Sequence, residues 1–439
     1  MKKPTAIFKI EYKKIIDLVL FIVFVLVSLY NTLTQALVNF FPAYRITKPL
    51  LIAIIFLYVC VWLFATQKNS DSIILAKHSL LLISIFLVVI IPAILFIILR
   101  LNSAPYKFVH DGVVQNESAT KFFLEGKNPY VENYLNTPLK DFPYPPGIHA
   151  AFDYYSYLPF TFIFPLTIQI WLEPILGWFD HRIVYLLCFI LVIGLIFRLI
   201  KNNDDRSIAV SIIGLNPFFV YFIIQGRNDI LVLLWIILSI LCLQKNRLTL
   251  STFFLAIGCA TKPFAWFLVP FFLLYLFGNG SWKEMKLFIF KSIIVFACVL
   301  GILVLPWIIA DSKAFLGDVI GFQSGMNAEN CAISGMGFSM LLLKLRLLSN
   351  SLADFPFFIV QLSLSLLAIP VLLYQQIRSN TLKRMLLNYS ILTGIVFFFA
   401  RAFLGNYLGY LMIIFCISFM VRDESKPILV ADEADDGRN

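Results

Sequence analysis

Long apolar runs recur along almost the whole chain, and they constrain its fold more than any other feature. A helix of about 20 apolar residues crosses the hydrocarbon core of a membrane, and it satisfies its own backbone hydrogen bonds there. Since 60% of the 439 residues are hydrophobic and only 14% are charged, no segment remains for a separate soluble domain. The sequence therefore predicts an all-α polytopic membrane protein, one domain over residues 1–439, with about twelve transmembrane helices. The clear runs are residues 15–34, 48–66, 79–100, 182–200, 207–225, 229–244, 287–310, 356–376, 386–402 and 404–421.

Two further apolar runs are interrupted. Residues 249–277 carry Lys262 and a proline at their centre; proline kinks a helix, and an ionised lysine at the bilayer centre is costly. We therefore predict two short helices that meet near Lys262 at one membrane face. Residues 160–178 contain two prolines, and we expect them to lie along the membrane surface or dip into it. The alternative makes each run one full span, but it moves the basic loops 201–206 and 245–248 outside.

Basic residues cluster in the short connections between the apolar runs. Cytoplasmic loops carry the excess of Lys and Arg, so the net charge of +10 predicts orientation in the membrane and not nucleic-acid binding. With the basic N-terminus inside, counting the spans places both termini in the cytoplasm. We expect a multi-pass protein of the cell (inner) membrane. Two segments then face the extracytoplasmic side: the first long loop, residues 101–181, with juxtamembrane helices, and the second long loop, residues 311–355.

The first long loop is the strongest candidate for chemistry. Asp111 stands where a helix is expected to begin. In VVQNESATKFFLEG the residues Val114, Ser118, Phe122 and Glu125 step by three or four, and a glycine follows as a stop. Asp111 can cap that helix, or it can accept a proton from an incoming hydroxyl, and both roles are compatible. Glu117 projects roughly 120° away from it, so a substrate-binding or supporting role fits better than a second base.

A rigid YPPG turn follows, in which Tyr144 is the first residue, and His149 lies two residues after its glycine. The turn is a structural corner in any case. His149 can be a surface residue, a hydrogen-bond donor to substrate or a metal ligand, but no partner ligand stands at a suitable spacing, so no metal is predicted. We expect His110, Glu117, Tyr144 and His149 to bind substrate.

Three cations recur at the predicted outer ends of helices. Arg227 lies in a tight turn with Asp229, and the two can pair at the membrane edge. Lys262 requires an anionic partner, either a substrate phosphate or a protein carboxylate, and Arg401 raises the same question. We expect these three cations to bind a donor phosphate by charge-assisted hydrogen bonds, with Asp229 contacting substrate.

The chain resembles the GT-C superfamily of membrane glycosyltransferases, and most closely its bacterial polyprenyl-phosphate-mannose-dependent branch. The resemblance rests on HDGVVQNESATKFFLEGKNPY, YPPG, the GRND turn and the TKP break, over about residues 100–345. It implies an inverting transfer on the extracytoplasmic side, with Asp111 as the catalytic base. Two additional helices precede the first long loop here, which leaves the role of residues 1–70 open.

The expected reaction moves a sugar, with mannose favoured, from a polyprenyl-phosphate donor to a lipid-linked or glycan acceptor. The lipid phosphate is already a good leaving group, so the chain needs a base and cations, and no cofactor is expected. The partners are the lipid-linked donor and the glycan or glycolipid acceptor, while the oligomeric state stays open. Two alternatives remain: a lipid-linked glycan polymerase or ligase, and a secondary transporter or lipid flippase, although transporters place ionisable groups near the midplane.

Overall fold

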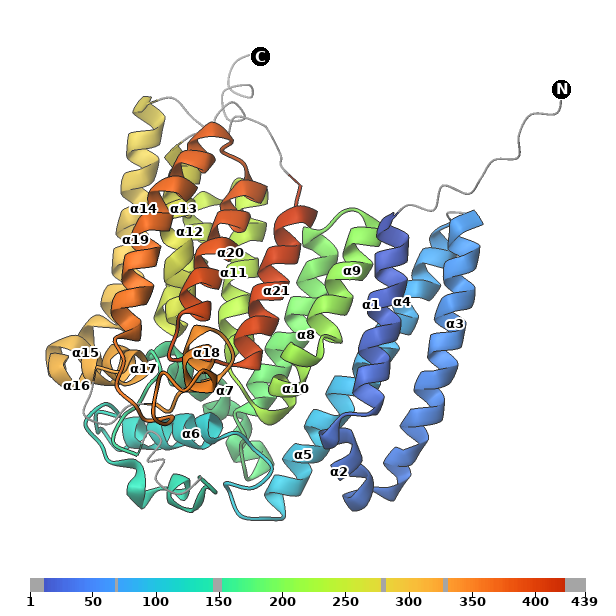
Figure 1. Ribbon diagram of the computed structural model, residues 1–439, viewed down its shortest axis with the longest axis horizontal. Helices are drawn as coiled ribbons and strands as arrows, with labels where there is room; N and C mark the ends of the chain where they lie inside the picture. The colour runs from blue at the N-terminus through green and yellow to red at the C-terminus, as the bar shows by residue number, and fades with distance from the viewer. Residues whose placement is uncertain (1–11, 68–69, 145–151, 278–281, 327–330, 423–439) are drawn as a thin grey trace.

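A computed structural model describes residues 12–67, 70–144, 152–277, 282–326 and 331–422. The chain forms a bundle of upright helices (Figure 1). The upright helices are α1 (Tyr12–Leu29), α3 (Thr47–Gln67), α4 (Asp71–Ile85), α5 (Ile91–Leu101), α8 (Arg182–Leu199), α9 (Asn203–Gly214), α10 (Pro217–Gln225), α11 (Asp229–Gln244), α12 (Leu248–Thr261), α13 (Val269–Phe277), α14 (Trp282–Leu303), α19 (Phe357–Arg378), α20 (Leu382–Phe398) and α21 (Gly405–Met420).

The fold is that of an all-α membrane protein, as predicted. In the described part of the chain, four helices are long and apolar enough to cross a membrane, or six if each of two bent pairs is one span. The bent pairs are α1 with α2 (Thr32–Phe40) and α9 with α10. Other apolar helices have 10–17 residues. The predicted number of about twelve spans is therefore not confirmed.

Helix α6 (Asp111–Leu124) lies across one end of the bundle, which we call the α6 end (Figure 1). The start of α1 and the end of α21 lie at the opposite end. The short helices of the second long loop also lie at the α6 end. They are α16 (Ser312–Leu316), α17 (Phe322–Ser324) and α18 (Phe338–Lys344), and α15 (Leu305–Ala310), which immediately precedes the loop, lies with them.

The two interrupted runs adopt different structures. The run at 249–277 breaks as predicted: α12 ends at Thr261, a 3-10 helix covers Pro263–Leu268, and α13 follows. The other run forms one helix, α7 (Phe160–Leu176), with both prolines inside it. Its first half packs against α6 and α12, whereas Trp171 and Ile175 near its end are more than three-quarters exposed.

The core of the bundle lies around α11, because almost every residue of this helix is buried. It packs against α8, α12 and α21. The first helices join this core through α9, which packs against α1 and α4. Here the buried Asp17 of α1 accepts hydrogen bonds from Tyr58 and pairs with Lys77 at 2.8 Å. The buried charges of Asp17 and Lys77 thus neutralise each other, which lowers the cost of their burial.

Two short strands join the second long loop to the turn before α21. Strand β1 (Ser334–Gly335) pairs in parallel with β2 (Ala402–Phe403). Sequence patterns of two residues are too short to predict such strands. The pairing fixes the second long loop against the α20–α21 connection at the α6 end.

Candidate functional site

The start of α6 is fixed by α8 and α10. Arg182 of α8 donates to the carbonyl oxygen of Phe108 at 2.8 Å, and the backbone N–H of His110 donates to the carbonyl oxygen of Gln225 at 2.8 Å. A Cβ built on Gly226 would overlap Val113 of α6, and the φ of Gly226 is +97°. Because only glycine combines that backbone angle with that space, α6 can lie directly against the turn after α10.

Asp111 is the first residue of α6, and its carboxylate has three neighbours. Its Oδ1 lies 2.7 Å from the backbone nitrogen of Gly112 and 2.8 Å from Nδ1 of His110, and its Oδ2 accepts from the Tyr144 hydroxyl at 2.9 Å. His110 is the capping residue, since the same Nδ1 lies 3.0 Å from the Gly112 nitrogen. His110 Nδ1 and Asp111 Oδ1 both lie within hydrogen-bond distance of the Gly112 N–H. When Nδ1 carries a hydrogen, it donates to Asp111 Oδ1, and the Gly112 N–H is left to the carboxylate. Asp111 thus supports the helix start while its side chain stays 27% exposed.

The surroundings of Asp111 keep it ionised. Burial acts to raise the pKa of this carboxyl, but His110, the Tyr144 hydroxyl and the charge of Arg227 outweigh it and hold the pKa well below its usual range. Tyr144, in turn, has its pKa raised by burial and by the Asp111 charge, so it remains a hydrogen-bond donor. This carboxylate therefore carries no proton at neutral pH.

Lys262 and Asp229 form a buried ion pair beside this helix start. The Lys262 ammonium donates to Oδ1 of Asp229, and the side-chain amide of Asn406 donates to Oδ2. Asn406 also accepts, through Oδ1, from Arg227 at 3.0 Å. The alternative that Lys262 pairs with a protein carboxylate is therefore confirmed, and Arg227 and Asp229 are connected through Asn406.

Arg227 differs from Lys262 in its partners. Within the described residues no carboxylate lies in ion-pair distance of its guanidinium group, which stacks 4.9 Å from the ring of Phe222. Its Nε is buried without a hydrogen-bond partner in the described part of the chain. A cation that lacks a protein anion can bind an anionic ligand, and a guanidinium group suits phosphate geometry well.

Glu117 belongs to a second cluster of charges, which holds α6 against α5 and α8. Arg100 of α5 binds it through both terminal nitrogens, at 2.9 and 2.6 Å, and also binds Asp180 at 2.7 Å. Asp180 bonds Arg182 in turn. These bidentate contacts fix the orientation of α6. The predicted contact of Glu117 with substrate stays a prediction.

Arg401 lies between the helices and the second long loop. Its Nε donates to the carbonyl oxygen of Cys331 and its Nη1 to that of Ala353, at 3.1 Å, and the side chain is almost fully buried. These contacts join the loop to the end of α20. They give Arg401 a loop-anchoring role. Its Nη2 is buried without a partner in the described residues, and the predicted role in phosphate binding stays a prediction. His149, the remaining predicted site residue, lies outside the described residues.

The sequence interpretation missed Asn406, which contacts Asp229 and Arg227, and Tyr157, whose hydroxyl lies against Gly112 beside Asp111. Asn406 lies in the first turn of α21, five residues after Arg401, and no local pattern indicated its role. Tyr157 lies in a tyrosine-rich segment of the first long loop, YYSYLP, where no single residue stands out. Among the described residues, His, Cys, Asp and Glu side chains form no group of three or more suited to a metal ion.

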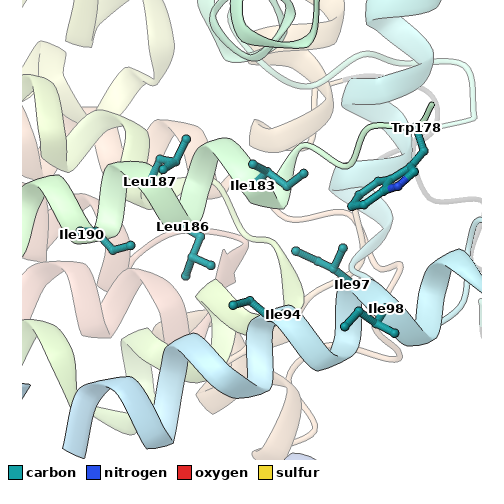
Figure 2. A pocket seen from close by; sticks show the side chains of 8 residues that line it. All are labelled: Ile94, Ile97, Ile98, Trp178, Ile183, Leu186, Leu187 and Ile190. Atoms are coloured by element: carbon teal, nitrogen blue, oxygen red, sulfur yellow. The ribbon is translucent and has the colours of Figure 1, made fainter. Parts of the chain in front are cut away.

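An apolar groove runs between α5 and α8 (Figure 2). Its volume is about 370 Å³. Figure 2 shows Leu186 of α8 pointing towards Ile94 and Ile97 of α5, with Trp178 at one end of the groove. The lining residues are Ile94, Ile97, Ile98, Trp178, Ile183, Leu186, Leu187 and Ile190. The same two helices carry Arg100 and Arg182, so the groove lies beside the charges that position α6.

The fold and the site define an integral membrane protein of helices with a carboxylate and cations gathered at one end of the bundle. The model of glycosyltransferase family 87 matches residues 142–404, more than half of the chain. The chain belongs to this family and is a membrane glycosyltransferase, which confirms the resemblance to the GT-C superfamily. The match includes Arg227, Asp229 and Lys262 but begins after Asp111. No curated protein matches the chain.

Proposed function

We propose that this glycosyltransferase moves a sugar, with mannose favoured, from a polyprenyl-phosphate donor to a lipid-linked or glycan acceptor. The transfer inverts the anomeric centre and takes place on the extracytoplasmic face of the cell membrane. Asp111 is the base, and Arg227 is the principal ligand of the donor phosphate, with Lys262 beside it. No cofactor takes part.

The chemistry requires one new bond and one broken bond. The acceptor hydroxyl oxygen attacks the anomeric carbon of the donor sugar, while the bond from that carbon to the phosphate oxygen breaks and leaves its electron pair on the phosphate. The proton of the acceptor hydroxyl passes to Asp111, a step that typically contributes about 10²–10⁴-fold to the rate. Arg227 stabilises the charge that develops on the phosphate.

One observation carries this proposal: a partly exposed carboxylate stands at the start of α6 within electrostatic influence of Arg227, which has no carboxylate partner among the described residues. A base and an unpaired cation are the two groups that the displacement requires. Tyr144 orients the base, because its hydroxyl donates to Oδ2 of Asp111 while Oδ1 lies beside Nδ1 of His110.

The apolar groove between α5 and α8 supports a lipid donor. An isoprenoid chain is an apolar ribbon, and burying it in an apolar groove is favourable by about 25 cal/mol for each Å² removed from water. The groove is lined by apolar side chains and lies between α5 and α8, the two helices whose charged residues position α6. A nucleotide sugar has no group that would occupy such a groove.

Sugar transfer by the purified protein tests the proposal. The full chain in detergent or lipid nanodiscs is incubated with radiolabelled polyprenyl-phosphate mannose and extracted membrane lipids, and the products are separated by chromatography. The same assay with GDP-mannose is the control for donor class. Label in a new glycolipid or glycan from the polyprenyl donor, with the opposite anomeric configuration, supports the proposal. Transfer from GDP-mannose alone contradicts it.

A further inference from the structure

The hydroxyl of Tyr157 reaches the first turn of α6. A Cβ built on Gly112 would overlap the Tyr157 hydroxyl oxygen and would lie 3.3 Å from its ring carbon Cζ. The hydroxyl therefore occupies the space that a side chain at position 112 would take. Gly112 immediately follows Asp111, so the absence of a side chain there brings a phenol next to the proposed base.

The backbone around Tyr157 is held from two directions. The Tyr155 hydroxyl donates to Oδ1 of Asn116 on α6 at 2.6 Å, and the Tyr155 backbone N–H donates to Asp318 of the second long loop at 2.7 Å. The carbonyl oxygen of Tyr157 accepts from the Tyr130 hydroxyl at 2.9 Å. These bonds fix where the Tyr157 side chain begins, so its hydroxyl is preorganised.

The Tyr157 hydroxyl adjoins Gly112 and lies within electrostatic reach of Asp111, Arg227 and Asp229. Burial raises the pKa of this phenol, the charges of Asp111 and Asp229 raise it further, and Arg227 opposes them. It therefore remains protonated and can donate a hydrogen bond. In the described part of the chain the hydroxyl has no protein hydrogen-bond partner, and it is not one of the fully buried polar atoms, so a ligand can reach it.

We propose that the Tyr157 hydroxyl donates a hydrogen bond to a hydroxyl group of the transferred sugar and so contributes to donor specificity. This inference rests on the proposed function, because it requires the acceptor oxygen at Asp111 and the leaving phosphate at Arg227. The sugar must then lie between those two groups, where the free hydroxyl of Tyr157 stands. A sugar hydroxyl there can accept the hydrogen bond for which the described residues offer no protein acceptor.

Kinetics of Tyr157→Phe with a set of donors test this role. The donors are polyprenyl-phosphate mannose and its 2-, 3-, 4- and 6-deoxy analogues. A neutral hydrogen bond changes binding by a factor of about 3–10, so we expect the variant to lose that factor in kcat/KM with the parent donor. With one deoxy donor, which lacks the partner hydroxyl, the wild type and the variant should become equal. The matched control is Tyr185→Phe, which removes a buried hydroxyl without a partner in the described residues and should change none of these values.

The other outcomes of these kinetics overturn either the role of Tyr157 alone or the proposed function as well. An unchanged kcat/KM in Tyr157→Phe, or an equal loss with every donor, overturns the role of Tyr157 while the wild-type transfer still supports the proposed function. Failure of the wild type to use any polyprenyl-phosphate sugar overturns both.

A second variant checks the geometry independently. Gly112→Ala should displace the Tyr157 hydroxyl and lower kcat/KM for the parent donor. In the Tyr157→Phe background the overlapping oxygen is gone, so the same substitution should cost less. Contacting residues show such coupling, whereas independent sites add. Fully additive losses would contradict the assigned contact.

Discussion

The Asp229 carboxylate at the start of α11 forms a buried ion pair with the Lys262 ammonium at the end of α12. The pair explains how a lysine is tolerated inside an apolar run, because an unpaired charge there would be costly. It also joins the ends of two helices beside Arg227. The pairing leaves Arg227 as the cation of this group with no carboxylate of its own in the described residues.

Variants at Lys262 should show separate effects on the thermal stability of the protein and on its KM for the donor. Lys262→Met leaves Asp229 buried without its cation, and breaking a buried pair in this way typically costs about 3–5 kcal/mol. The double variant Lys262→Met/Asp229→Leu removes both charges and should recover most of that loss in thermal unfolding. Its KM for the donor should remain raised, more than its KM for the acceptor. Full recovery of the donor KM in the double variant would make Lys262 purely structural.

Asp111→Asn should abolish sugar transfer and leave folding largely intact. Asparagine keeps the size of the side chain and an oxygen that can accept from Tyr144, but it cannot accept a proton from the acceptor hydroxyl. The expected loss in kcat is at least about 10²-fold, measured with labelled donor. Tyr144→Phe is the comparison and should lose less, since it removes a support of the base and not the base. Near-normal turnover of Asp111→Asn would refute the assignment.

Much of this site is predictable from local patterns. The helix break at Lys262, the helix beginning at Asp111 and the turn around Arg227 follow from proline, capping and hydropathy, which act within a few residues. Such signals placed the residues on the right elements. They also indicated that Lys262 needs an anion, although not which one.

Pairings over long sequence separations could not be predicted. Lys262 and Asp229 are 33 residues apart, and Asn406 and Asp229 are 177 apart. Such partners meet only when helices pack together, and the hydropathy pattern of a single sequence does not show which helices pack against each other. The same reason hid the contact of Tyr157 with Gly112, which depends on a missing side chain.

Asp318 should make the stability of the protein depend on pH. Burial, with a smaller effect of Asp311, raises its pKa to about 7, whereas an unfolded Asp titrates near ~3.9. The folded state therefore binds more protons between about pH 4 and 7, and this group's contribution to stability falls as pH rises through that window. Asp318→Asn keeps an acceptor for the Tyr155 N–H and should be more stable above pH 7, by on the order of 1–4 kcal/mol. Thermal unfolding from pH 4 to 8 measures this, and parallel curves for variant and wild type would contradict it.

Arg401 should anchor the second long loop. Its guanidinium group donates to carbonyl oxygens of Cys331 and Ala353, and removing it leaves both without that donor. Arg401→Gln should make the loop more sensitive to limited proteolysis under native conditions. Arg378→Gln is the matched control, because Arg378 bonds an exposed tyrosine of its own helix. A raised donor KM with unchanged proteolysis would instead favour phosphate binding by Arg401.

Filling the apolar groove should discriminate between donors by the length of their lipid. Leu187 lines the groove from α8 and is 44% exposed, so tryptophan can replace it without disturbing the core. Leu187→Trp should raise the KM for a long polyprenyl-phosphate sugar, because the isoprenoid chain loses its place between α5 and α8. A donor with a short chain, such as citronellyl-phosphate mannose, does not extend along the groove and should be used equally well by variant and wild type. Leu191→Trp, on the next turn of α8 and 55% exposed, is the matched control for an added indole outside the groove. If both substitutions affect long and short donors alike, the groove does not hold the lipid.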